Sequence, residues 1–458
     1  MKLLLRYIIL CLLAFNSWSI CAQGDFLLKN NVSEKIKFQF TSNLIIIPVE
    51  INGVILSFVL DTGVSKPILF NLSERDSLDL KDTQTFYLHG LGADGKLEAL
   101  KSKNNRFNIG GAVCNNQDLY VVFDNSINFT PRLGILVHGI IGFDLFKDFI
   151  VEINYNSEYI RLHKPESFVI KSPRKWKTLP IELYRRKPYL NAFVTLKENK
   201  KPVKLLIDTG SSDALWLFED EYNDMVPEKD KFFVDYLGKG LSGSVYGKRS
   251  KVNNFQLSEY SLDDVNVSFP DSASIDLAKV YKDRNGSIGG DILKRFNLFF
   301  DYNNKKIHLK KNGLFKDPFT YNNSGIVLEH NGNMYVKERI RMPSNTPSNG
   351  YSSRNSNDNS RQAVQIDFSI NYTMKLKPAY RIIEIRKSSN AYASGLRLGD
   401  ILISINGKPA YDFRLPEINR FFHGRTGSNL RLKIERNGAE MLFKFKLDNA
   451  FKFNEPSN

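Results

Sequence analysis

Two Asp-Thr-Gly motifs, Asp61-Thr62-Gly63 and Asp208-Thr209-Gly210, are the residues of this sequence best suited to chemistry. Each follows an apolar run, so each aspartate is expected at the end of a buried strand, with a glycine that permits the sharp turn after it. Two carboxylates within hydrogen-bonding reach cannot both ionise at low cost, and they share one proton over a broad acidic range. The ionised carboxylate can then accept a proton from water while the protonated one polarises a peptide carbonyl.

The two motifs belong to an internal repeat. One offset of 147 residues takes Asp61 to Asp208 and also takes Gly142, in a later apolar-Gly element, to Gly289. A single Asp-Thr-Gly is often an ordinary turn. Two duplicated elements in the same register indicate instead two halves with the same plan. We therefore expect each half to supply one carboxylate to a shared site on a pseudo-twofold axis.

Each half is expected to be mostly β-structure. Residues 45–51 and 54–60 flank Asn52-Gly53, a strong hairpin signal, and the second strand leads directly into the first Asp-Thr-Gly. The second half repeats this plan, with strands at 190–196 and 203–207 around a loop at 198–202. Short helices are expected near Asp144–Lys147 and Asp291–Arg295, and residues 168–180 read as the connection between the halves.

With these two Asp-Thr-Gly motifs and two apolar-Gly elements, residues 35–315 resemble the retropepsin and pepsin-like aspartic proteases. The resemblance implies a mainly β fold of two pseudo-symmetric β-barrel halves, with Asp61 and Asp208 as catalytic residues. It also implies that the threonines bond to the opposite loop, that the apolar-Gly elements pack under the catalytic loops, and that Ser211 donates a hydrogen bond to Asp208. The residues that support the catalytic loops are then Thr62, Gly63, Thr209, Gly210 and Ser211.

This family covers its cleft with glycine-rich hairpins called flaps. The candidates are residues 89–95 and 237–243, whose glycines suit a hairpin tip that approaches a substrate backbone. Neither contains the flap tyrosine of pepsins, which favours the retropepsin side of the resemblance. The expected substrate-contacting residues are Leu91, Gly92, Ala93, Gly238, Lys239 and Gly240.

Other catalytic interpretations have weaker support. Gly90–Gly95 matches the dinucleotide pattern G-x-G-x-x-G, but the surrounding pattern is a hairpin rather than a βαβ unit. The six histidines show no metal-ligand spacing with Cys, Asp or Glu. We expect no metal and no cofactor.

Residues 380–409 resemble bacterial PDZ domains, on the run from Ser389 through Ala393-Ser394-Gly395-Leu396 to Gly399-Asp400-Ile401 and Asn406-Gly407. The resemblance implies an α+β domain with a groove helix at 415–422 and closing strands at 430–435 and 441–447. Such domains add a peptide as an extra strand and hold its terminal carboxylate on backbone N–H groups. The expected carboxylate loop contains Ser324, Gly325 and Ile326. The alternative is that this domain only braces the protease.

The rest of the sequence predicts the domain boundaries and the cellular location. We expect a signal peptide at 1–22, the first protease half at 23–167, the second at 168–316, and the PDZ domain at 317–458 with a flexible insertion near 343–362. Export to the periplasm or the extracellular space follows, with lipid attachment through Cys21 as the weaker alternative. Cys114, the one cysteine left after cleavage, is expected as a buried small hydrophobe.

The net charge of +15 is spread along the sequence and does not favour a nucleic-acid partner. We expect a monomer with an internal pseudo-dimer, no integral membrane span after signal removal, and a peptide or protein substrate, with a peptide C-terminus at the PDZ domain. The leading hypothesis is an exported aspartic endopeptidase. The alternative is a non-catalytic peptide-binding or scaffolding protein that uses the cleft and the PDZ groove only to bind.

Overall fold

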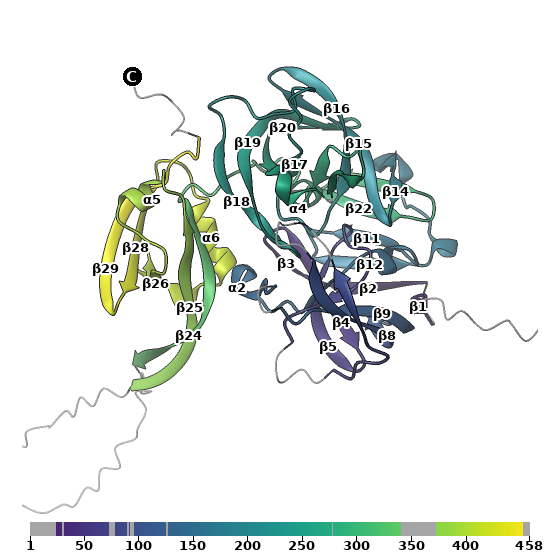
Figure 1. Ribbon diagram of the computed structural model, residues 1–458, viewed down its shortest axis with the longest axis horizontal. Helices are drawn as coiled ribbons and strands as arrows, with labels where there is room; N and C mark the ends of the chain where they lie inside the picture. The colour runs from purple at the N-terminus through teal and green to yellow at the C-terminus, as the bar shows by residue number, and fades with distance from the viewer. Residues whose placement is uncertain are drawn as a thin grey trace, which may run out of the picture.

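The computed structural model describes residues 24–29, 32–72, 78–88, 91, 96–124, 127–276, 278–339 and 372–451. Their fold is mainly β, as expected, with two similar halves and a separate C-terminal domain (Figure 1). The expected signal peptide and the expected insertion near 343–362 lie outside the described residues. Cys114 is buried and free, which confirms its expected role as a small hydrophobe.

The first half is built on a sheet in which β5 is central. Its hairpin partner is β4, and the turn at Asn52-Gly53 has positive φ at both residues, as a tight right-twisted hairpin requires. In sheet order the strands are β1 (Leu27–Leu28), β9 (Ala112–Val121), β6 (Ile68–Leu69), β10 (Gly139–Ile141), β5 (Val54–Leu60), β4 (Leu44–Ile51), β8 (Leu97–Ile109) and β7 (Gln84–Leu88), with β3 (Gln39–Thr41) beside β4.

The second half repeats this plan. In the first half β10 pairs with β5 in parallel, and in the second half β21 pairs with β16 in the same way. The pair Ile141 and Leu60 corresponds to the pair Ile288 and Ile207, each residue being shifted by 147. In sheet order the strands are β14 (Glu182–Tyr184), β15 (Lys187–Leu196), β16 (Asn199–Ile207), β21 (Gly286–Ile288), β17 (Leu215–Leu217), β20 (Tyr260–Pro270), β19 (Gly243–Leu257) and β18 (Phe233–Gly240).

A third sheet joins the halves. Its central antiparallel pair is β11 with β22, and Glu152 lies opposite Phe299, its own counterpart at the 147-residue offset. The pseudo-twofold axis therefore passes between these two strands. In order the strands are β13 (Lys177–Pro180), β23 (Lys306–Lys311), β22 (Phe296–Asp301), β11 (Ile150–Asn154), β12 (Tyr159–His163) and β2 (Ser33–Lys37).

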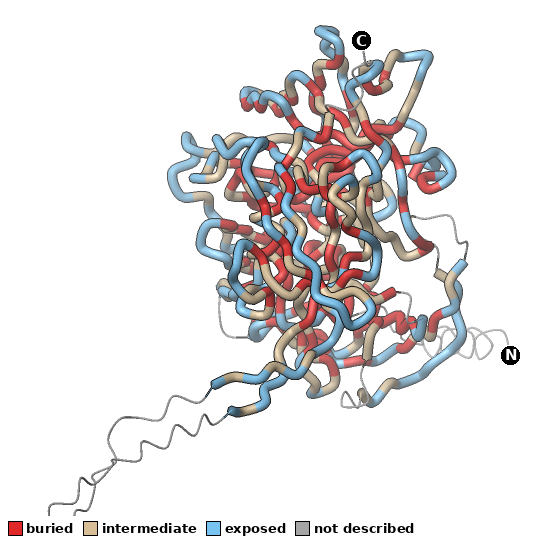
Figure 2. Tube along the Cα trace, turned by 90° about the vertical axis from the view of Figure 1, so that its left-hand side faces the viewer, coloured by how far each residue is buried: buried red, intermediate tan, exposed pale blue. Residues whose placement is uncertain are grey.

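The C-terminal domain has a sheet of its own, with the order β24 (Ile326–Arg339), β25 (Tyr372–Ile385), β26 (Ile401–Ile405), β28 (Asn429–Arg436) and β29 (Ala439–Lys446), and β27 (Lys408–Pro409) beside β26. Helix α6 (Leu415–Phe422), which coincides with the expected groove helix, packs against β24. Figure 2 shows buried residues concentrated in the interior of the fold, whereas the distal ends of β24 and β25 are mostly exposed or half-buried.

The remaining elements are short. Helices α3 (Phe143–Phe146) and α4 (Gly290–Leu293) follow the apolar-Gly elements and begin one residue earlier than expected, while α2 (Thr130–Leu133) was not anticipated. The others are α5 (Asn390–Ala393) and the 3-10 turns η1 (Pro165–Ser167), η2 (Pro173–Lys175), η3 (Ser272–Ser274), η4 (Ala278–Val280) and η5 (Ala410–Asp412).

One expectation about strands was wrong. The second-half hairpin turns at Lys197-Glu198, both with positive φ, and β16 continues through the segment expected to be a loop at 198–202. Pro202 is accommodated within β16, opposite Phe193. The expected connection at 168–180 ends in strand β13, which pairs with β23 and so belongs to the joining sheet.

Candidate active site

The two Asp-Thr-Gly loops meet between the halves. Asp61 follows β5 and Asp208 follows β16, and each aspartate donates its backbone N–H to the parallel neighbour strand, to Ile141 O at 2.8 Å and to Ile288 O at 2.9 Å. Each catalytic loop is therefore fixed by the apolar-Gly element of its own half.

The structure brings the two carboxyl groups together beside Gly63, where a Cβ would lie 3.0 Å from Asp61 Oδ1 and 3.3 Å from Asp208 Oδ1. Each also accepts a hydrogen bond from the glycine of its own loop: Gly63 N to Asp61 Oδ1 at 2.6 Å, and Gly210 N to Asp208 Oδ1 at 3.1 Å. A Cβ on Gly210 would lie 2.3 Å from the Asp61 carboxyl carbon. Gly210 is therefore required for the close approach of the loops.

The threonines lock the two loops to each other. The Thr62 hydroxyl donates to Ile207 O at 2.6 Å and accepts from the Thr209 N–H at 3.1 Å. The Thr209 hydroxyl makes the mirrored pair, donating to Leu60 O at 2.7 Å and accepting from the Thr62 N–H at 3.0 Å. Both threonines are buried. Each side chain thus satisfies backbone groups of the opposite half and positions the dyad.

The glycines of the apolar-Gly elements lie directly beneath the catalytic loops. A Cβ on Gly142 would stand 1.9 Å from the Asp61 carbonyl oxygen, and one on Gly289 would stand 2.3 Å from the Asp213 carbonyl oxygen. The following amides also bind the loops, Phe143 N to Val64 O at 3.1 Å and Gly290 N to Ser211 O at 2.7 Å. This contact explains why the apolar-Gly elements were duplicated together with the aspartates.

Burial and mutual repulsion determine the charge of the dyad. The pKa of Asp61 is raised to about 7, first by desolvation and then by the neighbouring Asp208 charge. Burial also raises the pKa of Asp208, but the cations Arg284 and Lys187 oppose that rise. The shared proton is therefore best assigned to Asp61, and the ionised member of the pair is Asp208.

These two cations are site residues that the sequence interpretation missed. The register of β15 with β16, extended by two residues from Tyr189↔Leu206, places Lys187 opposite Asp208. Arg284 is buried and donates from Nε to Gly286 O at 3.0 Å, next to β21. The sequence could have indicated Lys187. If the hairpin turn is placed at Lys197-Glu198, the pairing of the two strands puts Lys187 opposite Asp208.

One expected contact is absent. The Ser211 hydroxyl makes no hydrogen bond to Asp208 among the described residues, and it lies 3.0 Å from where a Cβ of Gly289 would be. The expectation that Ser211 donates a hydrogen bond to Asp208 was therefore wrong, because its side chain faces the apolar-Gly element.

The two candidate flaps touch each other. Leu91 contacts Trp216, Leu237 and Val245 of the second half, and its carbonyl oxygen accepts the Ser242 N–H at 2.9 Å. Gly240 lies so close that a Cβ would stand 2.1 Å from Leu91 O. Gly238 and Lys239 lie on β18 in the same hairpin, whereas Gly92 and Ala93 lie outside the described residues.

The expected carboxylate loop lies where β24 begins. Ser324 and Ile326 are buried, and Gly325 has φ of +71°. The loop abuts the end of α6, since the N–H groups of Asn323 and Ser324 both donate to Phe422 O, at 2.9 and 3.2 Å. The loop and the groove helix thus meet at one end of the groove.

Comparisons with known families agree with this geometry. Residues 47–145 match the family model of aspartyl proteases, and residues 381–436 match that of PDZ domains. The first match includes Asp61 and the first apolar-Gly element. The protein therefore carries a retropepsin-like aspartyl protease domain and a PDZ domain.

A curated protein also shows similarity over a short segment. Synaptopodin-2 of Mus musculus is 43% identical to this protein over 56 residues, which is 12% of this sequence and 5% of that protein. The matched segment thus spans about a twentieth of this relative's length.

No helix among the described residues is both long and apolar enough to cross a membrane. The same residues contain no group of three or more His, Cys, Asp or Glu side chains that could hold a metal ion.

Proposed function

We propose that this protein is an exported aspartic endopeptidase that hydrolyses peptide bonds with water activated by Asp61 and Asp208. One observation carries the proposal: two carboxyl groups from duplicated loops lie side by side and are locked by reciprocal threonine contacts. A dyad of this kind needs no metal and no nucleophilic side chain.

The asymmetry of the pair supports an assignment of roles. Asp208, where Arg284 and Lys187 oppose the rise in pKa caused by burial, is the general base that accepts a proton from the attacking water. Asp61, whose pKa of about 7 keeps it protonated in acid, donates to the carbonyl oxygen as the tetrahedral diol forms. Asp208 then gives its proton to the leaving amine as the C–N bond breaks. A hydroxyl of the diol returns a proton to Asp61, which leaves a carboxylic acid product and restores the shared proton.

The flap contact suits the same function. The Leu91–Ser242 hydrogen bond holds the two flap hairpins together, and their separation would admit an extended peptide. The substrate is therefore a peptide or an unfolded protein segment. Export rests on the signal-like pattern of residues 1–22, and the PDZ domain supplies a second peptide-binding surface.

The test is cleavage of a mixed-sequence peptide library by the protein from residue 23 onward. Cleavage should occur in mildly acidic buffer and be blocked by a statine-type transition-state analogue, which mimics the diol. An Asp61→Asn control, prepared identically, should be inactive. Tight binding of the analogue without any turnover would favour the non-catalytic peptide-binding alternative.

A further inference from the structure

In the PDZ domain, the edge strand β24 lies beside helix α6, and these two elements together are called the groove here. Strand β24 pairs with β25 on one side, and among the described residues no strand pairs with its other edge. Helix α6 packs beside that edge, and Phe422 at its end contacts the loop before β24. This is the arrangement in which a PDZ domain adds a peptide strand.

Helix α2 of the first protease half lies across this groove. Gly134, just after α2, is so close to α6 that a Cβ there would stand 2.8 Å from the Leu415 Cβ, and its φ of +68° suits glycine. Two residues earlier, Arg132 Nη2 lies 3.0 Å from Glu384 Oε1, and Glu384 is the β25 partner of Val327 on β24. The segment therefore contacts both walls, and Figure 1 shows α2 between the two bodies beside α6.

The carboxylate loop at the end of the groove is also engaged. Asn322 Oδ1 accepts from Ser324 N at 3.0 Å, Ser324 Oγ at 2.7 Å and Gly325 N at 3.2 Å. The Ile326 N–H donates to Ser324 Oγ at 3.0 Å. The amides that would hold a terminal carboxylate thus bind the amide oxygen of Asn322 and the hydroxyl of Ser324, both from the same loop.

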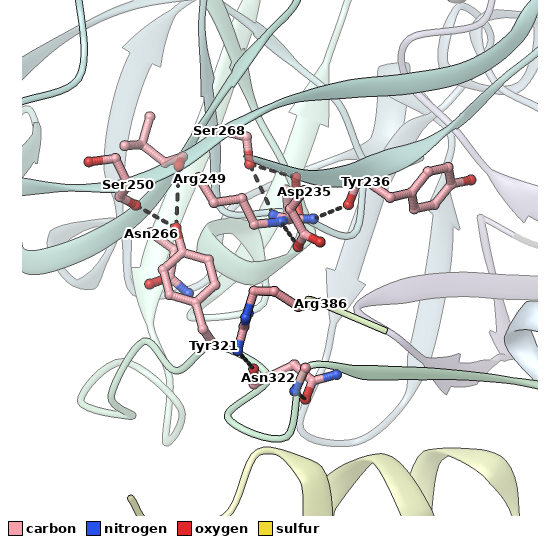
Figure 3. A network of polar contacts seen from close by, with 12 residues as sticks. Asp235, Tyr236, Arg249, Ser250, Asn266, Ser268, Tyr321, Asn322 and Arg386 are labelled. Carbon is pink, nitrogen blue, oxygen red and sulfur yellow. Dashed lines mark hydrogen bonds and ion pairs between the residues drawn. The ribbon is translucent and has the colours of Figure 1, made fainter. Parts of the chain in front are cut away.

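The loop is anchored to the second half as well. Arg386 donates to Asn322 O at 3.3 Å and stacks on Phe233 of β18, 4.8 Å from the ring centre. Beside it, the Tyr321 hydroxyl donates to Ser250 O, and Arg249 bridges Asp213 and Asp235 (Figure 3). Because Asp235 and Phe233 belong to the flap strand β18, the PDZ domain contacts both a flap hairpin and α2.

The other side of α2 packs toward the catalytic loop. The rings of Phe129 and Phe70 lie 5.2 Å apart, and Leu133 belongs to the same hydrophobic cluster. That cluster also contains Val64, the residue after the first Asp-Thr-Gly, and Leu241 at the tip of the second flap hairpin. A displacement of α2 would therefore disturb contacts beside Asp61.

We propose that α2 is the intramolecular occupant of the PDZ groove, so that a peptide on β24 and the docked α2 exclude each other. The ligand that competes is an internal extended segment of a polypeptide rather than its free C-terminus, since Asn322 fills the carboxylate loop. The docking is displaceable, because the Arg132–Glu384 pair is partly exposed and exposed ion pairs stabilise only weakly. Binding in the groove is then linked to the packing beside the dyad. This inference rests on the PDZ match and the α2 contacts, and does not depend on catalysis.

Hydrogen exchange of the full-length protein tests the docking. The reporters are the amides of Leu133 and Gly134, which donate to Phe129 O and Thr130 O. Glu384→Arg should speed their exchange several-fold, and the charge-exchanged double variant Arg132→Glu/Glu384→Arg should restore slow exchange. Glu338→Arg, which removes ion pairs with Lys375 and Lys377 at the distal end of the same two strands, is the matched control. Unchanged exchange in Glu384→Arg would overturn the proposal.

Peptide binding tests the competition. The probe is a fluorescein-labelled nonapeptide library, prepared with free and with amidated C-termini, against proteins that also carry Asp61→Asn so that peptides remain intact. Glu384→Arg should bind several-fold more library than the parent, equally for both preparations, and the double variant should return to the parent level. Equal binding by parent and Glu384→Arg, or binding of free C-termini alone, would overturn it.

Discussion

Around Asp61 the neighbouring strand presents Leu44, whereas at the corresponding register position beside Asp208 it presents Lys187. The backbone of the two loops is nearly the same: each aspartate amide bonds to its β10 or β21 neighbour, and each threonine bonds to the other half. Duplication has thus preserved the hydrogen bonds that position the carboxyl groups, while the charges around them have diverged.

The difference begins at the hairpin turns. From the turn to the aspartate, β16 is two residues longer than β5, as seen from the turns at Asn52-Gly53 and Lys197-Glu198. The partner strand β15 is therefore shifted relative to β4, and Lys187 lies opposite Asp208 where Leu44 lies opposite Asp61. Two added strand residues therefore give the dyad one neutral side and one cationic side.

The largest effect is expected from breaking the pair itself. Asp61→Asn and Asp208→Asn should each reduce kcat by at least about a thousandfold, and the double variant should be little worse, because the two carboxyl groups act as one unit. Steady-state cleavage of a library-derived peptide measures this. Substantial activity in either single variant would place the catalytic centre elsewhere.

Sequence was a good guide where local signals agree with tertiary contacts. Strand β5 was expected at 54–60 and is found there, because Asn52-Gly53 sets the turn and Asp-Thr-Gly sets the end. Helix α6 was likewise expected at 415–422, from the resemblance of this region to PDZ domains, and it is found there. The proximity of the two aspartates followed from the duplication and the symmetry that it implies.

Sequence was a poor guide where contacts override local preference. Pro202 and its polar neighbours indicated a loop, yet β16 runs through them because β15 pairs along its length. Lys187 therefore received no role, since its position depends on that register. Helix α2 is a single turn without periodicity, and its contact with Leu415 joins segments far apart in the sequence. Ser211 was misassigned because adjacency in sequence does not fix the direction of a side chain.

The reciprocal threonine bonds, which both loops share, can be tested by measuring the stability of variants. Thr62→Val and Thr209→Val each leave a buried carbonyl and a buried N–H without partners, so each should lower the free energy of unfolding by roughly 2–4 kcal/mol. Thr41→Val is the matched control, because its buried hydroxyl has no partner and its loss should cost little. Urea denaturation gives all three values. Unequal losses at Thr62 and Thr209 would show that the lock is one-sided.

A smaller effect is expected on the pH dependence of stability, because the buried Asp61 has a raised pKa. Asp61 has a pKa of about 7 in the folded protein and near 3.8 when unfolded, so the wild type should lose stability as pH rises from about 4 to 7. Asp61→Asn resembles the protonated form and should not show this loss. At pH 8 it should be more stable than the wild type by roughly 1–3 kcal/mol, with little difference at pH 4. The exposed Asp271→Asn should follow the wild-type curve, and parallel curves for Asp61→Asn would contradict the raised pKa.

The smallest effect should come from the asymmetric part, the cation beside Asp208. Lys187 lowers the pKa of both carboxyl groups, and its own pKa is lowered by burial, which is consistent with a position inside the site. In the proposed mechanism, cleavage requires Asp208 ionised and Asp61 protonated. Removing Lys187 should raise both pKa values and therefore move both limbs of the pH–rate profile to higher pH. Lys187→Met should therefore lose activity on the acid side and retain it further on the alkaline side, whereas the exposed Lys171→Met should leave the profile unchanged. A uniform loss at all pH values would indicate that Lys187 only supports the fold, and a shift of one limb alone would indicate that it acts on a single carboxyl group.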